Sequence, residues 1–149
     1  MAPDPTIHAC AILVGPKAAL IRGPAGSGKS QLTWSLLEAA SQGLLPFARL
    51  VADDRAHLEW RSDRLLVRPA PALAGLIEIH GLGIRQVAYE AVAAVGLVID
   101  LAAADAARHP AASASQAVIG GIRLTRLAVA SGMAPLPLVL AALSTTPAG

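Results

Sequence analysis

Apolar residues occur in short runs that glycine, proline or charged residues interrupt. The runs Ala9–Val14 and Lys17–Arg22 are separated by a Gly-Pro pair, which is a turn signal, so they predict a β-hairpin. Across Lys29–Gln42, leucine and alanine return every three or four residues, which is the spacing of an amphipathic helix. Gly43 is well placed to end that helix, because glycine readily adopts the left-handed conformation common after a helix C-terminus.

Later apolar runs predict further short strands and a second helix. The strands are expected at Arg49–Ala52, His57–Trp60, Leu65–Arg68, Ile77–Ile79, Val95–Asp100, Ile119–Thr125 and Leu127–Val129, and those at Ile77–Ile79 and Val95–Asp100 are expected to be buried. A helix is expected at Pro135–Leu143, where the prolines fall in the first turn, followed by a disordered tail within residues 143–149. The pattern predicts a single strand-rich α/β domain over residues 1–149, with few helices and no even βαβ alternation.

Composition narrows the classes of function. Apolar residues make up 54% of the 149, the formal net charge is +2, and Lys and Arg form no cluster, so nucleic-acid binding is not expected. No stretch offers about 20 uninterrupted apolar residues, and the N-terminus lacks the basic and apolar regions of a signal peptide. We therefore expect a cytoplasmic protein without a membrane span. The lone cysteine, Cys10, is expected to pack as a small apolar side chain on a strand.

The segment GPAGSGKS, between the predicted hairpin and helix, matches the Walker A phosphate-loop pattern G-x-x-x-x-G-K-[ST] in full. The expected nucleotide-binding residues are Gly23, Pro24, Ala25, Gly26, Ser27, Gly28, Lys29 and Ser30. Glycines without Cβ let backbone N–H groups converge on phosphate oxygens, and the helix that follows points its positive dipole end at them. Lys29 would neutralise the β- and γ-phosphates, and the Ser30 hydroxyl is a hard ligand suited to Mg²⁺. The loop thus predicts binding of ATP with Mg²⁺ but does not choose a reaction.

The reaction depends on which carboxylates complete the site. VGLVID ends at Asp100 and RLVADD ends at Asp53-Asp54, and each fits an apolar strand that ends in a metal-binding carboxylate. Adjacent strand residues point to opposite faces, so at most one of Asp53 and Asp54 is expected to face the nucleotide. GLIEIHGLGI poses a related problem, because Glu78 and His80 lie in an apolar run where a polar group without a partner is costly to bury. Spacing alone leaves open which strand lies beside the loop.

In four blocks the chain resembles the catalytic domain of the bifunctional HPr kinase/phosphorylase family. These are His8, fifteen residues before the loop; the loop itself; LVADDR at Leu50–Arg55; and LIEIHGLGI at Leu76–Ile84, which is similar to the family signature E-I-R-G-L-G-I. The match runs from about His8 to at least Leu101. The family phosphorylates a serine on the histidine-containing phosphocarrier protein HPr, and its fold is related to phosphoenolpyruvate carboxykinase.

The resemblance implies roles for individual side chains. Glu78 would complete the metal site together with Ser30. Asp53 would accept the proton of the seryl hydroxyl. Asp54 is the nearby alternative for that role, although a structural ion-pair partner is the favoured interpretation of it. Arg108, in AARHP, would contact the transferred phosphoryl group.

Further roles and partners are implied in the same way. His8 would lie near the nucleotide phosphates, and Lys29 would stabilise charge on the transferring group. Asp100 would be an ordinary strand-end residue, with metal binding as its alternative role. The family also implies a homo-oligomer, in its case a hexamer. The partner would be an HPr-like phosphocarrier, and the reaction would regulate carbohydrate metabolism through the phosphotransferase system.

The chain departs from the family pattern in three places. Better-known members carry an additional N-terminal domain, so the resemblance is to a short form limited to the catalytic C-terminal domain. His80 replaces the signature arginine, and Ala130–Leu138, where the family has a basic loop linked to dephosphorylation, contains no Arg or Lys. The resemblance therefore supports kinase activity and leaves reverse phosphorolysis open. The alternatives are a small-molecule kinase, an ATP-binding regulatory protein, or a P-loop ATPase that relies on Asp100.

Overall fold

The computed structural model describes residues 6–148. Its strands are β1 (Thr6–His8), β2 (Cys10–Val14), β3 (Lys17–Arg22), β4 (Ala48–Ala52), β5 (Arg55–Arg61), β6 (Arg64–Pro69), β7 (Leu76–Ile79), β8 (Gly83–Gln86), β9 (Ala93–Asp100), β10 (Gln116–Ile119) and β11 (Ile122–Ala128). Its α-helices are α1 (Lys29–Ser41) and α2 (Pro135–Ser144), and short 3-10 helices occupy Pro71–Leu73 and Ala112–Ser115. Within residues 6–148, no helix is long and apolar enough to cross a membrane.

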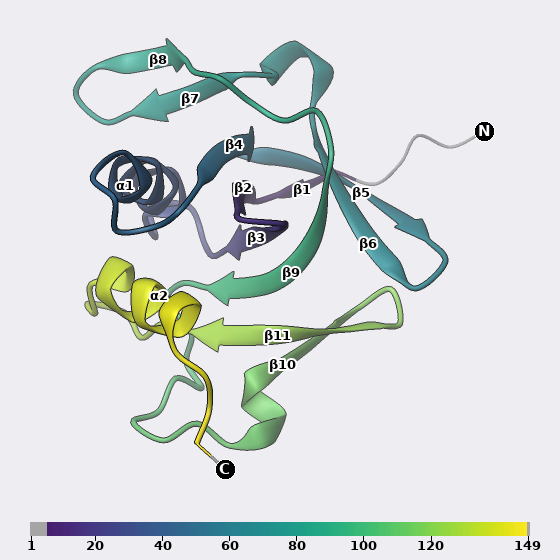
Figure 1. Cartoon of the computed structure of the whole chain (residues 1–149), viewed down its shortest axis with the longest axis vertical. Coiled ribbons are helices and arrows are strands. Elements are labelled where there is room, and N and C mark those ends of the chain that lie inside the picture. Colours follow the sequence, from purple (N-terminus) through teal and green to yellow (C-terminus); the bar gives the residue numbers. More distant parts are fainter. Residues whose placement is uncertain (1–5, 149) are drawn as a thin grey trace.

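Nine of these strands form one sheet and two form a separate hairpin. In the large sheet β1, β5, β6, β9, β3, β2 and β4 are neighbours in that order, and β11 joins β9 while β10 joins β11. Strand β9 runs parallel to both β3 and β11, whereas the other pairs are antiparallel. Strands β7 and β8 pair only with each other and lie above α1 and β4 in Figure 1. The strand-rich α/β architecture with few helices is confirmed.

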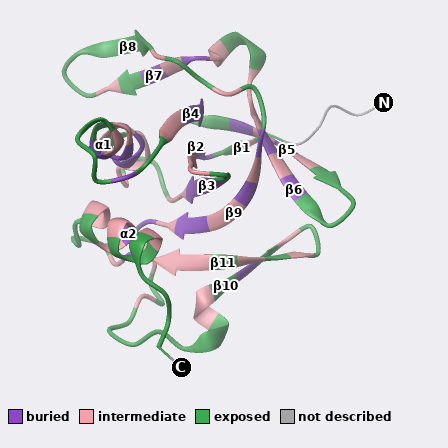
Figure 2. Ribbon diagram, viewed as in Figure 1, coloured by how far each residue is buried: buried purple, intermediate pink, exposed green. Residues whose placement is uncertain are grey.

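The central strands are buried on both faces, because successive side chains of a strand point in opposite directions. On one face Cys10, Ile12 and Ile21 join the apolar core that α1 and α2 cover (Figure 1). On the other face Ala11 and Leu20 join a second core formed with residues of β5, β6, β9 and β10. Figure 2 shows buried residues along β9 and inside α1, whereas β8 and the tip of the β5–β6 hairpin are exposed. Because an apolar core covers each face of the sheet, consecutive residues of the central strands are apolar.

Most predicted elements are confirmed within one or two residues. The hairpin of β2 and β3 pairs in antiparallel register, and α1 starts at Lys29 and ends at Ser41. Gly43 follows it with φ 80°, as expected of a glycine that ends a helix, and its N–H donates to the Ala40 carbonyl at 3.1 Å.

Three elements differ from the prediction. The strand expected at Ile119–Thr125 is broken by the Gly120-Gly121 turn, where β10 ends and β11 begins. Strand β11 then continues through Arg126 instead of stopping there, because Arg126 is paired with acidic side chains. Strand β7 was expected to be buried, but only Ile77 is, because β7 lies outside the large sheet. Helix α2 continues to Ser144, so the first two residues of the expected tail, 143 and 144, are helical, and Gly149 lies outside the described residues.

The glycines between β10 and β11 offer a matched test of packing. Gly120 and Gly121 have φ of 58° and 81°. A Cβ on Gly120 would overlap the indole of Trp60, whose Nε1 donates to the Ile119 carbonyl at 3.1 Å, whereas a Cβ on Gly121 would meet nothing within 4 Å. Gly121→Ala should therefore cost only the left-handed backbone, about 1–2 kcal/mol. We expect Gly120→Ala to lower the free energy of unfolding by at least about 1 kcal/mol more, because the ring must also move. Urea denaturation followed by circular dichroism measures both losses, and equal losses would contradict the close packing.

Candidate functional site

A cavity of about 990 Å³ opens beside the glycine-rich loop that joins β3 to α1. It gathers residues from four of the sequence blocks singled out above. Its lining residues are His8, Gly23, Pro24, Ala25, Gly26, Gly28, Lys29, Ser30, Gln31, Trp34, Asp54, Glu78, Ile79 and His80. Segments from β1, the loop, the turn after β4 and the β7–β8 hairpin therefore meet at one place.

The loop itself ends in a left-handed glycine. Gly28 is the N-cap of α1 with φ 99°, a conformation that glycine adopts without strain, and this turns the chain directly into the helix. The first N–H groups of a helix have no partner within the helix, and they carry the positive end of its dipole. Lys29 Nζ donates to the carbonyls of Gly23 at 2.9 Å and Pro24 at 3.2 Å, so its ammonium lies over the loop. The arrangement presents donors and positive charge to the cavity.

Beneath the loop, the carboxylate of Asp53 accepts three hydrogen bonds. Ser30 Oγ donates to Asp53 Oδ1 at 2.6 Å, Cys10 Sγ donates to the same oxygen at 3.1 Å, and the backbone N–H of Glu78 donates to Oδ2 at 3.0 Å. Asp53 is only 6% exposed. A buried carboxylate needs such donors, since it can only accept hydrogen bonds and is costly to remove from water. Asp53 therefore holds the Ser30 hydroxyl in place from below and does not line the cavity.

Asp54 has the opposite surroundings. Its φ is 67°, a left-handed conformation that is unusual outside glycine, and its side chain is 65% exposed and lines the cavity. His8 lies next to it, with Nδ1 4.0 Å from Asp54 Oδ1. The sequence prediction that only one of the two neighbouring acids faces the cavity agrees with this geometry, and the acid that does so is Asp54.

Glu78 and His80 reach the cavity from the β7–β8 hairpin. Both side chains are exposed and both residues line the cavity, while only the backbone of Glu78 contacts Asp53. The question raised by these polar residues in an apolar run is thereby answered, because neither side chain is buried. Among residues 6–148, no three His, Cys, Asp or Glu side chains form a group that would hold a metal ion by themselves.

Asp100 lies at the end of β9, beside the end of β3, but its oxygens are occupied by arginines. Arg22 donates to it through Nε at 2.7 Å and Nη2 at 2.8 Å, and Arg126 donates through Nε at 2.6 Å. Burial would raise the pKa of Asp100, but the hydrogen bonds from the two guanidinium groups outweigh burial and lower the pKa below its ordinary value. Arg126 also pairs with Asp105 at 2.8 Å. Asp100 is thus part of an ion-pair network outside the cavity.

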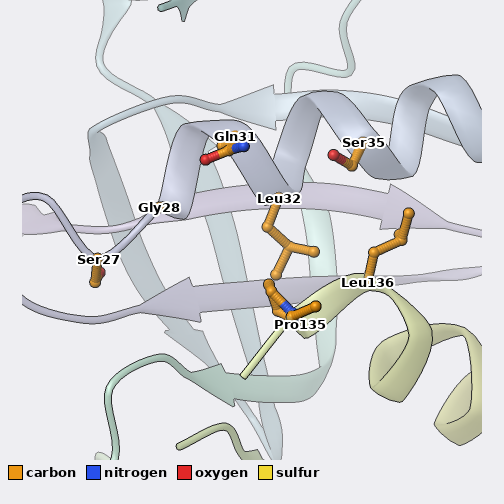
Figure 3. Close-up of a pocket in the computed structure, with 8 residues that line it drawn as sticks. Ser27, Gly28, Gln31, Leu32, Ser35, Pro135 and Leu136 are labelled. Carbon is orange, nitrogen blue, oxygen red and sulfur yellow. The ribbon is translucent and has the colours of Figure 1, made fainter. Parts of the chain in front are cut away.

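A second hollow, of about 310 Å³, lies between the N-terminal half of α1 and the start of α2 (Figure 3). Figure 3 shows Leu32 of α1 facing Pro135 and Leu136 of α2 across it, with Gln31 and Ser35 on the helix beside them. None of the carboxylates discussed above lines this hollow. It is therefore a mostly apolar gap between the two helices, and it adjoins the polar cavity at Gly28 and Gln31, which line both.

No family model matches the chain. Curated proteins named HPr kinase/phosphorylase align with 88 of its residues: the one from Exiguobacterium sp. is 38% identical over 58% of this chain, and one from Limosilactobacillus reuteri is 36% identical over the same share. Over these 88 residues the chain is similar to the HPr kinase/phosphorylases. The match takes in 26% and 25% of those two relatives, so the chain aligns with about a quarter of their length.

A solved structure shares the fold across almost the whole chain. It is the structure titled HPr(Ser) kinase/phosphatase from Coxiella burnetii, and it superposes with a TM-score of 0.72 at 24% identity. The superposition covers 93% of this chain and 88% of that one. The mixed α/β fold expected from the resemblance to HPr kinase/phosphorylase is therefore confirmed.

The structure brings together most of the side chains that the HPr kinase/phosphorylase resemblance pointed to. His8, Lys29, Ser30 and Glu78 line the cavity, and Asp53 lies directly behind Ser30. Arg108 is exposed on the loop that follows β9 and does not line the cavity. Sequence reasoning gave Cys10 no site role, and its only signal was a position two residues after His8.

Acidification should reveal the contribution of Asp100 to stability. A carboxyl whose pKa is lowered by folding adds stability above its unfolded pKa of about 3.9, and this stability is lost as the pH falls through the lower folded value. We expect Asp100→Asn to lower the free energy of unfolding by about 2 kcal/mol at pH 7, since bonds to charged groups are lost. The difference from the wild type should shrink below about pH 4.

Urea denaturation at pH 7 and pH 3 measures this difference. The control is Asp105→Asn, which removes the exposed partner of Arg126 and should have the smaller effect because water screens that pair. A loss for Asp100→Asn that is the same at both pH values would contradict the ion-pair role.

Proposed function

We propose that this chain is an ATP- and Mg²⁺-dependent protein-serine kinase that phosphorylates an HPr-like phosphocarrier protein. The observation that carries the proposal is the single cavity in which the glycine-rich loop, His8, Asp54 and Glu78 meet, with the Ser30 hydroxyl held by Asp53. The similarity to proteins named HPr kinase/phosphorylase supports the choice of acceptor class.

The loop residues 23–30 are proposed to bind the nucleotide phosphates. The support comes from the left-handed turn at Gly28, the helix that starts at Lys29, and the ammonium over the loop. Lys29 is the only Lys or Arg among the residues that line the cavity in the part of the chain that the structure describes. It is therefore the group proposed to stabilise charge on the transferring phosphoryl group.

The donors near Ser30 fit Mg²⁺. This ion keeps several waters and is bound through one or two carboxylates together with substrate phosphates, so it does not need a cluster of three acidic side chains. Ser30 and Glu78 line the same cavity, and Asp53 contacts the Ser30 hydroxyl. We assign the ion to Ser30 and Glu78, with Asp53 orienting the hydroxyl. When bound there, Mg²⁺ would neutralise phosphate charge and orient the substrate.

The proton of the acceptor hydroxyl needs a carboxylate within reach. Asp53 was the sequence-based choice, but it is 6% exposed and already accepts three hydrogen bonds. Asp54 lines the cavity with an exposed side chain, and His8 lies beside it. We therefore assign the proton-accepting role to Asp54 and a positioning role to Asp53. In phosphorolysis, inorganic phosphate would attack the seryl phosphate to form pyrophosphate as the bond to the seryl oxygen breaks, and Asp54 in its protonated form would donate a proton to that oxygen.

Other aspects follow only from the resemblance. We include in the proposal a homo-oligomeric assembly, a cytoplasmic location and a place in phosphotransferase-system regulation. Arg108 lies outside the cavity, so any contact it makes with a phosphoryl group would require its loop to move or another copy of the chain to supply it.

A second function is favoured by one observation. The cavity has Lys29 as its only Lys or Arg among the described residues, and residues 130–138 contain none. A protein that binds ATP without efficient transfer would need no further cation. Comparison of ATP turnover with ATP binding separates this ATP-binding regulator from the kinase.

Transfer to a phosphocarrier is the direct test. The purified chain is mixed with ATP, Mg²⁺ and an HPr-like protein, and phosphoserine is sought by mass spectrometry. We expect transfer by the wild type, and we expect Asp54→Asn to lose about 10²–10⁴-fold in kcat while still binding ATP, because only the proton acceptor is removed. The opposite pattern, in which Asp53→Asn keeps ATP binding and loses transfer while Asp54→Asn transfers normally, would return the base to Asp53. Intact ATP binding with no transfer by the wild type would favour the regulator.

The metal assignment is tested by binding alone. Calorimetric titration with ATP, with and without Mg²⁺, compares Glu78→Gln with Asp100→Asn. We expect Glu78→Gln to reduce the gain in affinity that Mg²⁺ brings by about tenfold, because a hard oxygen ligand with negative charge is lost. Asp100→Asn should keep the full gain, since its arginine partners hold it outside the cavity. Loss of the gain in Asp100→Asn instead would support the P-loop ATPase alternative.

A further inference from the structure

We propose that Cys10 is a positioning residue whose thiol holds Asp53 and Asp54 in their two opposite orientations. The proposal rests on the function proposed above, because it concerns the acids of that site. Cys10 is fully buried at the start of β2, directly under the turn that follows β4. It does not line the cavity, so it would act only through its neighbours.

One sulfur atom contacts both acidic residues. Cys10 Sγ donates to Asp53 Oδ1 at 3.1 Å and accepts from the backbone N–H of Asp54 at 3.4 Å. It also lies 3.9 Å from Ser30 Oγ, which donates to the same oxygen of Asp53 at 2.6 Å. The thiol therefore supports the carboxylate that holds Ser30 and the backbone that carries Asp54.

The backbone at Asp54 needs such support. Its φ of 67° is a left-handed conformation that costs a non-glycine residue energy and persists where the surroundings hold it. Two contacts from the β1–β2 connection hold it here. The N–H of Ala9 donates to the Asp54 carbonyl at 3.1 Å, and the N–H of Asp54 donates to the Cys10 sulfur. Because of this turn, Asp53 points inward and the next residue, Asp54, points into the cavity.

The chemistry of the buried thiol suits this role. Burial, and then the negative charge of Asp53, raise the pKa of Cys10 to about 12, so the sulfur keeps its proton at neutral pH. A protonated thiol can donate and accept at once, whereas a thiolate beside a carboxylate would repel it. Serine would keep both abilities, and alanine would remove both. Cys10→Ser should therefore preserve the positioning of the two acids, and Cys10→Ala should remove it.

The first test does not depend on kinase activity. Cys10 is the only cysteine of the chain, so the infrared spectrum contains a single S–H stretching band, which moves to lower wavenumber as the thiol donates a stronger hydrogen bond. We expect the wild-type band to lie below that of Asp53→Asn, because a neutral amide accepts more weakly than a carboxylate. Bands at the same wavenumber in the two proteins would overturn the contact and with it the proposal.

The second test separates positioning from packing. We expect Cys10→Ala to lower the kcat for transfer at least tenfold with the KM for ATP within twofold, and Cys10→Ser to recover most of the loss. The control is Ile12→Val, which removes one methylene from the same core cluster two residues along β2 and whose apolar side chain cannot form a hydrogen bond with either acid. It should keep the wild-type kcat. A wild-type kcat in Cys10→Ala, or an equal loss in Ile12→Val, would overturn the proposal.

Failure of the proposed function would look different. If the wild type transfers no phosphoryl group, the kinase assignment fails, while the infrared comparison still decides whether Cys10 holds Asp53. The positioning effect is then read from the gain in ATP affinity that Mg²⁺ brings. We expect that gain to fall in Cys10→Ala and to return in Cys10→Ser, and an unchanged gain in Cys10→Ala would overturn the proposal.

Discussion

The arrangement of the cavity depends on one buried carboxylate. Asp53 accepts hydrogen bonds from Ser30 at the start of α1, from Cys10 on β2 and from the backbone of Glu78 on β7. Three segments distant in sequence are thereby tied to the turn after β4. A carboxylate has only acceptors to offer, so its burial is compatible with folding only when all of these donors are in place. The relative positions of the loop, the hairpin and the neighbouring acid follow from that requirement.

Local features of the fold could be predicted from the sequence because they depend on residues close together in the chain. The β2–β3 hairpin, α1 and the glycine at position 43 are set by turn residues and by apolar spacing. The prediction for β7 was wrong about burial, since periodicity does not tell whether a strand joins the main sheet. The continuation of β11 through Arg126 was missed for a similar reason, because Arg126 is neutralised by acids distant in sequence.

The sequence predicted which residues belong to the candidate site but not which of their side chains face the cavity. The motif at residues 23–30 and the blocks around His8 and Glu78 pointed to residues that do line one cavity. The sequence could not tell which of Asp53 and Asp54 faces it, because the answer depends on a left-handed turn held by the sulfur of Cys10, 43 residues away from Asp53. For Asp100 the sequence predicted the place in the fold but not the ion pairs. It lies beside the end of β3 as a strand-end carboxylate should, but two arginines occupy its oxygens.

The charges around the cavity have a consequence of their own. Lys29 brings one positive charge, whereas Asp54 and Glu78 bring two negative ones. The two carboxylates therefore oppose the entry of a polyanion into the cavity, whereas Lys29 and the amides at the start of α1 favour it. Counter-ions that enter with a polyanionic ligand would offset the two carboxylates, so its occupancy would follow the divalent-ion content of the surroundings as well as its own concentration.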